Sequence, residues 1–165
     1  MRSSTEPGRR RSPTAEQLQA WRTYIETAET LRTKIGSRLQ AESGVSAGDY
    51  AVLLALSEAP DRRMRSSALA QLIDWERSRL SHHLGRMERR SLVRREECVT
   101  DNRGAEVVLS STGFELFRRA SAPHLRAIQE LFIDALTPEQ LMAMEDASRA
   151  LSGHLAELGA EEGKA

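Results

Sequence analysis

Cysteine is almost missing from this chain of 165 residues, which contains only Cys98. One cysteine cannot form a disulfide within the chain, and a chain of this length can bury a core without one. The reducing cytoplasm is therefore the expected location. Long apolar runs are missing too: YAVLLAL, residues 50–56, is far shorter than the roughly 20 residues that span a bilayer, and no signal-peptide apolar region follows the N-terminal arginines. We expect a soluble protein with no membrane partner.

Net charge is also lacking, because 24 Lys and Arg residues balance 24 Asp and Glu residues. The charges are nevertheless segregated along the chain. Residues 62–103 hold eleven arginines against six acids, a net charge of +5, whereas residues 124–165 hold three basic residues against eight acids, a net charge of −5. Arginine provides 22 of the 24 basic residues, which favours two-pronged contacts to phosphate or guanine, although genomic base composition can give the same bias.

The sequence contains no nucleophile elbow, P-loop or dinucleotide fingerprint. Its four histidines are not accompanied by the cysteines or acids that would complete a metal-ligand set: His82, His83, His124 and His154. A small thiol buried in a strand explains Cys98 better than a redox sensor, because no resolving cysteine exists and only Arg94 and Arg95 are nearby to stabilise a thiolate. We expect no enzymatic activity, cofactor or metal.

The segment RSRLSHHLGRMERR, residues 77–90, has the most informative pattern in the chain. At 100° per residue, Leu80, Leu84 and Met87 form one narrow apolar stripe. The opposite side is rich in hydrogen-bond donors: Ser78, His82, Gly85, Arg86 and Arg89. The segment contains one acid, Glu88, against five arginines. The pattern predicts a helix with a buried face and a face that suits a polyanion, for which nucleic acid is the obvious candidate.

Capping and breaking residues predict where the other helices begin and end. They are Thr14 with Gln17 and then Gly44 for a first long helix, Ser46 and Pro60 for a second, and, after a loop at 61–65, Ser66 for a short third helix at 67–73. A tight turn at Asp74 and Trp75 joins this third helix to the helix at 77–90. A short helix, a tight turn and a basic helix make a helix-turn-helix arrangement.

After Arg90 the apolar period changes from 3.6 to about 2, which predicts strands at 92–97 and 105–109 with a hairpin tip at 101–104. Two strands attached to a helix-turn-helix make a winged helix. A long helical pattern then starts at Thr112, and Pro123 predicts a kink or break near Ala122. Thr137, Pro138 and Gln140 begin the last helix. The first and last helices are longer than the central lobe needs, so we expect their apolar stripes to pack against a partner chain.

This order, with SRLSHHLGRMERRSLVRREECVTDNRGAEVVLSSTG and GDYAVLLALSEAP, resembles the MarR family of transcriptional regulators over residues 15–158. The most specific part is the spacing from the basic helix through D-x-R-G to L-[ST]-x-x-G. The resemblance implies a mainly α fold with a small two- to three-stranded antiparallel wing and long N- and C-terminal dimerisation helices. The expected regions are a disordered basic tail at 1–13, a helical dimerisation region at 14–45 and 112–158, a winged helix-turn-helix DNA-binding lobe at 46–111 and a flexible tail at 159–165.

Two positions differ from the pattern of this family, which commonly has Gly at position 91 and Thr at position 110. Gly would tolerate a left-handed backbone at the end of the basic helix, so Ser91 either adopts that unfavourable conformation or ends the helix differently. Ser110 replaces one hydroxyl by another. Neither change removes a group that is expected to face DNA.

Candidate DNA contacts follow from the position of each residue. The N-terminal part of a recognition helix reads bases, which selects Arg77, Ser78, Arg79, Ser81 and His82, and leaves Arg86 and Arg89 to phosphates. At the hairpin tip, Arg103 would enter the minor groove beside Asn102, with Asp101 orienting its guanidinium. Arg62, Arg63 and Arg65 precede the third helix, whose N-terminus suits a phosphate. His83 is either a DNA contact or a packing residue, and Gly85 either permits close DNA approach or is merely tolerated.

The function implied by the resemblance is a homodimeric regulator, a repressor that a small molecule releases from a pseudo-palindromic operator. An effector pocket would draw on Trp21, Tyr24, Trp75 and His124, although ordinary core packing explains each of them better. Two other functions remain open on the residues alone. The lobe could dock on a protein without binding DNA, or the chain could be a ligand carrier.

Overall fold

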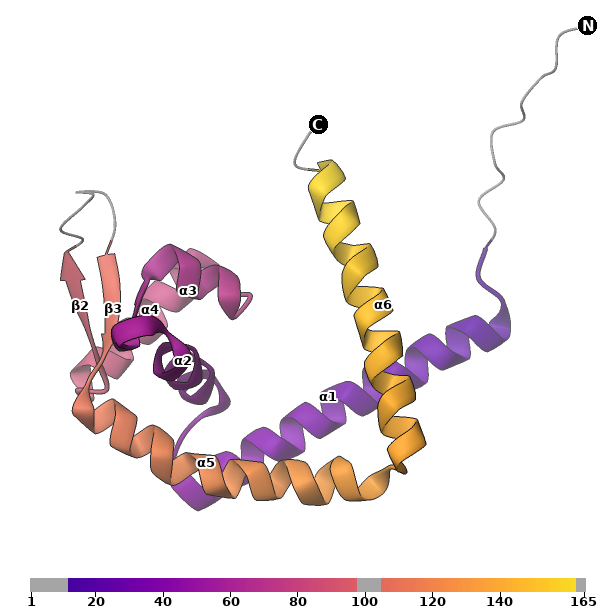
Figure 1. Cartoon of the computed structure of the whole chain (residues 1–165), viewed down its shortest axis with the longest axis horizontal. Coiled ribbons are helices and arrows are strands. Elements are labelled where there is room, and N and C mark those ends of the chain that lie inside the picture. The colour runs from indigo at the N-terminus through magenta and orange to yellow at the C-terminus, as the bar shows by residue number, and fades with distance from the viewer. Residues whose placement is uncertain (1–11, 98–104, 163–165) are drawn as a thin grey trace, which may run out of the picture. The chain divides into compact units, whose positions relative to one another are not determined.

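The computed structural model describes residues 12–97 and 105–162, and most of these residues lie in helices, with three short strands and the connecting turns making up the rest (Figure 1). The elements are α1 (Ala15–Ser43), α2 (Ala47–Glu58), the 3-10 helix η1 (Pro60–Arg62), β1 (Arg63–Arg65), α3 (Ser66–Leu72), α4 (Arg77–Arg89), β2 (Val93–Glu97), β3 (Ala105–Leu109), α5 (Ser111–Leu131), the 3-10 helix η2 (Ile133–Ala135) and α6 (Pro138–Glu162). The predicted mainly α fold with a small antiparallel sheet is confirmed. The chain forms two compact units, Met1–Lys34 and Ile35–Ala165.

The helix ends show why several boundaries were predictable. At the start of α1, Gln17 N donates to Thr14 Oγ1 (3.2 Å) and Thr14 N donates to Gln17 Oε1 (2.9 Å). Thr137 and Gln140 repeat this reciprocal pair at the start of α6. Such capping boxes satisfy backbone N–H groups that a helix start otherwise leaves without partners.

Two local predictions were wrong, and a third was wrong in part. Ser66 is the first residue of α3 rather than its cap, because Arg65 occupies the cap position without a side-chain hydrogen bond. The predicted loop at 61–65 contains β1, which pairs with β3. Of the kink or break predicted near Ala122, the break does not occur, because α5 continues past Pro123 to Leu131. A proline removes a single intrahelical donor, and neighbouring contacts can hold the helix on both sides of it.

The strands form one antiparallel sheet in the order β1-β3-β2. Val108 of β3 lies opposite both Arg63 of β1 and Arg94 of β2, and Leu109 lies opposite Val93. Alternation places Val93 on the buried side and Arg94 on the exposed side of β2. The sheet therefore has one face against the helices, and β2 leads directly from α4.

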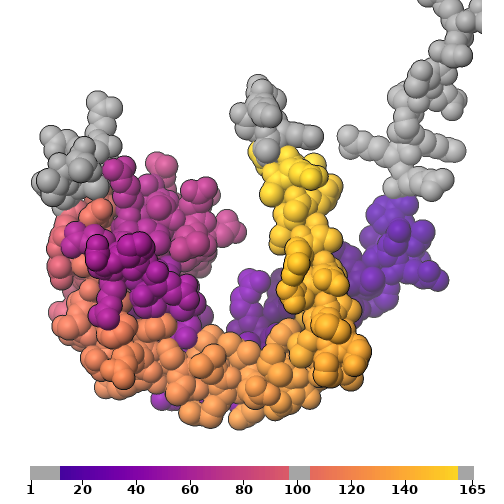
Figure 2. All heavy atoms as spheres, viewed as in Figure 1, coloured from indigo at the N-terminus to yellow at the C-terminus, as the bar shows by residue number. Residues whose placement is uncertain are grey.

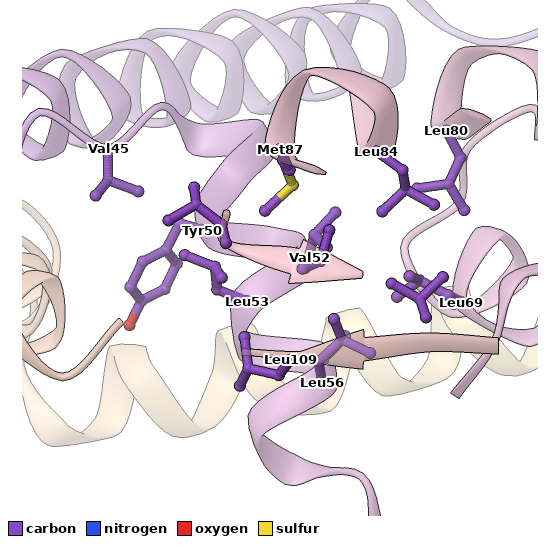
Figure 3. Packing of buried hydrophobic residues seen from close by; sticks show 14 of the residues in the cluster. Val45, Tyr50, Val52, Leu53, Leu56, Leu69, Leu80, Leu84, Met87 and Leu109 are labelled. Carbon is purple, nitrogen blue, oxygen red and sulfur yellow. The ribbon is translucent and has the colours of Figure 1, made fainter. Parts of the chain in front are cut away.

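One hydrophobic core joins α2, α3, α4 and the sheet. The predicted stripe on α4 is fully buried, because Leu80, Leu84 and Met87 each have 0% exposure. Figure 3 shows these three side chains facing the core residues Val52, Leu53 and Leu56 of α2 and Leu69 of α3. At about 1.5–3 kcal/mol for each large aliphatic side chain, this burial fixes the rotation of α4 about its own axis.

The last helix buries little of its own surface. Between residues 138 and 159, every residue is exposed except the half-buried Leu141. Figure 2 shows the C-terminal half of α6, in yellow, as a column of atoms one helix wide. Within residues 12–97 and 105–162, none of the helices combines the length and apolar character that crossing a membrane requires.

Candidate nucleic-acid interface

The exposed face of α4 carries all the residues that the sequence selects for base or phosphate contacts on this helix. Arg77, Ser78, Arg79, Ser81, His82, Arg86 and Arg89 are exposed, whereas Leu80, Leu84 and Met87 are buried on the other side. Glu88 is half-buried rather than part of the exposed face. The face therefore presents arginine, serine and histidine donors to solvent.

Arg79 is held against the turn that precedes α4. Its guanidinium lies over the Trp75 ring, 4.2 Å from the ring centroid. The backbone of Trp75 is itself fixed, because its backbone N–H donates to Ala70 O (2.9 Å). The preceding residue, Asp74, adopts a left-handed φ of 53°. A cation over an aromatic face gains about 0.5–1 kcal/mol at an exposed site. Arg79 is therefore oriented before any partner binds.

A buried polar network ties α4 to the start of α2. Asp49 accepts a hydrogen bond from Arg90 Nη1 (2.7 Å), and Asp49 Oδ1 lies 3.0 Å from His83 Nε2. On the other edge of the imidazole, Nδ1 lies 2.8 Å from Arg86 Nη2. Because arginine only donates, Nδ1 accepts and the proton of the neutral ring lies on Nε2, facing Asp49. His83 is thus a buried packing residue.

The surroundings of this network shift two pKa values. Burial alone would raise the pKa of Asp49, but its hydrogen bond and charge interaction with Arg90, helped by His83 and Ser46, lower it below the usual range. Burial lowers the pKa of His83, and the charges of Arg86 and Arg79 lower it further, against the opposite pull of Asp49. Asp49 therefore stays ionised and His83 stays neutral near pH 7.

Gly48 lets α2 approach this network closely. A Cβ atom at this position would lie 3.0 Å from His83 Cε1 and 3.0 Å from Trp75 Cη2. Such contacts are tighter than side chains normally make, so a larger residue would push the Trp75 and His83 rings. Sequence reasoning missed the roles of Gly48, Asp49 and Arg90, although the Gly48-Asp49 pair at a helix start was a usable signal.

The end of α4 is closed by Ser91 in the left-handed conformation (φ 58°). Ser91 N donates to Glu88 O (2.8 Å), and Leu92 N donates to Met87 O (3.0 Å). These two bonds make a Schellman motif, and Leu92 and Met87 are both buried beside it. Of the two possibilities that the sequence left open, Ser91 adopts the unfavourable backbone that glycine would adopt freely.

Leu92 also bonds to the start of α5 through its backbone. Its carbonyl oxygen accepts from Ser110 N (3.1 Å) and from Ser110 Oγ (2.9 Å), while Gly113 N donates to Ser110 Oγ (2.9 Å). A Cβ at Gly113 would lie 2.1 Å from Leu92 O, which no side chain allows. The L-[ST]-x-x-G spacing thus reflects a cap and a close backbone approach.

Arginines before α3 make contacts within the lobe itself. Arg62 lies over the Phe114 ring of α5, 3.6 Å from its centroid. Arg63 Nη1 lies 3.4 Å from Glu96 and 3.3 Å from Glu106, two acids that face each other across β2 and β3. Arg63 therefore offsets a like-charge repulsion in the sheet. Arg65, at the end of β1, has an exposed side chain.

Similarity to known structures identifies the family of this chain. The crystal structure of AbsC, a MarR family transcriptional regulator from Streptomyces coelicolor, matches with 38% sequence identity and a TM-score of 0.83, covering 89% of this chain and 99% of that chain. This chain belongs to the MarR family of transcriptional regulators. A family model for the MarR family also matches residues 43–104, whereas a search of curated proteins found no match.

Two further MarR family structures contain DNA. Sco3205 from Streptomyces coelicolor, in complex with DNA, matches with 38% identity and a TM-score of 0.82, covering 87% of this chain and 94% of that chain. A mutant MarR from E. coli complexed with operator DNA matches at 18% identity with a TM-score of 0.73, covering 82% of this chain and 95% of that chain, and shows the shared fold.

The predicted MarR hairpin tip lies outside the described residues. This applies to Asp101, Asn102 and Arg103, and also to Cys98. Their expected roles stay predictions. Among the described residues, no three His, Cys, Asp or Glu side chains gather in a way that would hold a metal ion.

The four candidate effector residues have different surroundings. Trp21 and Tyr24 are exposed on α1, and Trp75 packs its ring edge-on against His83 with centroids 5.0 Å apart. His124 of α5 lies against Tyr50 of α2, with ring centroids 4.3 Å apart. Its Nδ1 is buried and has no hydrogen-bond partner among residues 12–97 and 105–162, and burial lowers the pKa of His124. The effector pocket stays a prediction.

Proposed function

We propose that this MarR family protein is a homodimeric, sequence-specific DNA-binding repressor that a small molecule releases from its operator. The observation that carries the proposal is the exposed face of α4. It offers Arg77, Ser78, Arg79, Ser81, His82 and Arg86 to solvent on a helix whose other face is anchored in the core. A rigid helix with donors on its N-terminal turns suits the major groove, where base edges present acceptors.

Each half of a pseudo-palindromic operator would receive one α4, with the half-site centres about one helical turn apart. Arg79 is the strongest base-reading candidate on α4, because Trp75 holds its guanidinium in place. Arg86 lies about two turns further along α4 and suits a phosphate. Arg103, two residues after Asp101, is the candidate for the neighbouring minor groove.

The direct test measures binding to DNA from the promoter next to the protein's own gene, by fluorescence anisotropy at physiological salt. Arg79→Ala and Arg103→Ala should each weaken specific binding, by about 1–3 kcal/mol where a bidentate base contact is lost. Arg149→Ala is the matched control, because Arg149 is an exposed arginine on α6 that pairs only with Glu145 among the described residues. Full affinity in both test variants would refute these site assignments.

Salt dependence separates this function from docking on a protein. Neutralising phosphates releases counterions, so the affinity should fall steeply as salt rises. If the affinity for DNA depends neither on the DNA sequence nor on the salt concentration, the result would favour a protein-interaction module instead. The same assay, repeated with small aromatic acids, tests release.

Support for release comes from the contact between His124 and Tyr50. His124 Nδ1 is a buried polar atom next to an aromatic ring, and no residue that the structure describes bonds to it. Such an atom can accept or donate a hydrogen bond to a ligand at little desolvation cost. An aromatic acid that raises the melting temperature and lowers DNA affinity together would support release. One that raises the melting temperature without affecting DNA binding would indicate a ligand carrier.

A further inference from the structure

Arg95 of β2 reaches across the outer surface of α4. Its Nη2 donates to the backbone oxygen of Ser81 (2.8 Å), and its Nε lies 3.0 Å from Glu88 Oε2. Its backbone N–H donates to the other carboxylate oxygen, Glu88 Oε1 (3.0 Å). One residue of the sheet thus contacts two points on α4 that are seven residues, or about 10 Å, apart.

Gly85 provides the path for this side chain. It lies between Ser81 and Glu88 along α4, and a Cβ there would be 3.5 Å from Arg95 Nη2. That is ordinary contact, so the guanidinium already covers the glycine. A longer side chain at position 85 would displace it. Gly85, which the sequence left unexplained, thus has a neighbour within the protein itself.

The alternation of β2 explains why Arg95 faces α4. Val93 and Arg95 point to the same side of the strand, and Val93 is buried against the core. Arg94 points to the other side, where its Nε bonds to Glu96 (2.5 Å). Of the two adjacent arginines, Arg94 therefore belongs to the outer face and Arg95 to the contact with α4.

We propose that Arg95, with Glu88 and Ser81, is a brace that sets the position of the β2–β3 hairpin relative to α4, and thereby lets both elements engage one DNA at once. This inference rests on the proposed DNA binding. Two linked contacts strengthen each other only when their geometry permits simultaneous engagement. Arg95 is on this view a positioning residue, and its effect on DNA binding acts through the hairpin.

Glu88 provides a test in which the two interpretations predict changes of opposite sign. If Arg95 acts on DNA simply as a positive charge, removing the nearby Glu88 carboxylate should tighten binding, because DNA repels that charge. If Arg95 is a brace, Glu88→Ala removes its partner and should weaken binding roughly tenfold. Glu76→Ala is the control, because Glu76 is an exposed acid just before α4 with no ion pair among the described residues. We expect unchanged or tighter binding for it.

The experiment measures binding of the full chain to labelled promoter DNA for wild type, Glu88→Ala, Arg95→Ala, the double variant and Glu76→Ala. The double variant should bind about as weakly as Arg95→Ala, because residues that act as one unit are not additive. A hydroxyl-radical footprint should lose protection at the outer flanks of the site and keep it at the centres. Glu88→Ala removes the acceptor of the Arg95 N–H itself, so the informative signal in the free protein is faster amide exchange at the other residues of β2 and β3, which would show that the hairpin has loosened.

The outcomes separate the brace from the function on which it rests. Wild-type protein that binds no DNA overturns both proposals. Wild-type binding together with Glu88→Ala affinity equal to or tighter than wild type overturns the brace alone. If Glu88→Ala melts below the assay temperature, Glu88→Gln supplies the same comparison, because it also removes the charge and should still weaken binding if the brace holds.

Discussion

At the scale of single residues, Ser91 carries a conformation that side chains disfavour. A left-handed backbone costs a non-glycine residue about 1–2 kcal/mol, because Cβ approaches the following carbonyl oxygen. Ser91 keeps it because two backbone hydrogen bonds to Glu88 O and Met87 O end α4 there. The protein therefore tolerates local strain at the point where α4 turns into β2.

Replacing this serine by glycine should stabilise the protein. Ser91→Gly removes the Cβ strain, which should raise the free energy of unfolding by roughly 1 kcal/mol. The greater entropy that glycine gives to the unfolded chain should offset part of this gain. Urea denaturation measures the change. Ser121→Gly, inside α5, is the control and should lower stability. Equal destabilisation by both variants would refute the strain at Ser91.

The buried His83 and the half-buried His124 should make the stability depend on pH. Burial holds the pKa values of His83 and His124 below their ordinary value in the folded protein. Between the ordinary pKa and the lowered one, the unfolded chain binds more protons than the folded chain. Stability is therefore complete above about pH 6.5 and falls as the pH decreases. The lowered pKa of Asp49 makes its own contribution disappear only at more acidic pH.

Thermal melting between pH 7.5 and 5.5 measures this effect. We expect a lower melting temperature at pH 5.5 in the wild type. His124→Leu removes one of the two groups and should reduce the pH dependence while leaving the part due to His83. A wild-type melting temperature that is constant over this range would contradict the proposed burial of neutral histidines.

At the scale of elements, Gly113 sets how closely α5 can begin to the end of α4. Gly113→Ala would force a Cβ to within 2.1 Å of Leu92 O. The backbones must then separate, and we expect a loss of at least about 2 kcal/mol in unfolding free energy. Gly153→Ala is the control, because a Cβ there has open space and should increase stability by up to about 1 kcal/mol. Chemical denaturation of both variants tests this contrast.

The elements that the sequence predicted well are those defined by local signals. The period of Leu80, Leu84 and Met87 is sufficient to orient α4, and the Thr14 and Thr137 capping boxes are sufficient to start α1 and α6. Each signal depends on residues within one or two helical turns. Such signals do not require knowledge of the rest of the fold.

What the sequence missed depends on partners far along the chain. β1 has three residues, Arg-Met-Arg, and exists because Met64 pairs with Val107. Asp49 is buried because Arg90, 41 residues later, reaches it. Arg95 resembles a DNA-facing charge until its contact with Ser81 is visible. No local pattern distinguishes an arginine that binds the protein itself from one that awaits a partner.

At the scale of the whole molecule, the terminal helices leave apolar side chains without cover. They include Leu18, Trp21 and Tyr24 on α1 and Met142, Leu151, Leu155 and Leu158 on α6, each 43–61% exposed. Exposed apolar stripes of this kind mark interfaces, and the proposed homodimer would cover both helices. Such a dimer would present two copies of α4 to one operator.

Light scattering after size-exclusion chromatography tests the dimer. Leu151→Glu together with Leu155→Glu should shift the mass from dimer to monomer and weaken operator binding. Ser152→Glu adds one such negative charge at another exposed position of α6 and should leave the dimer intact. If the wild type has the monomer mass at micromolar concentrations, the interface is wrong.

The backbone of one residue, Leu92, connects the end of α4 to the start of α5. Its N–H completes the end of α4, and its carbonyl holds Ser110 at the start of α5. Because Ser110 N also donates to this carbonyl, part of the contact runs directly from backbone to backbone, where a change of side-chain rotamer cannot absorb a displacement. A small tilt of α5 would therefore rotate α4 with it. A ligand that binds beside α5 and tilts it would change the orientation of the exposed face of α4 directly.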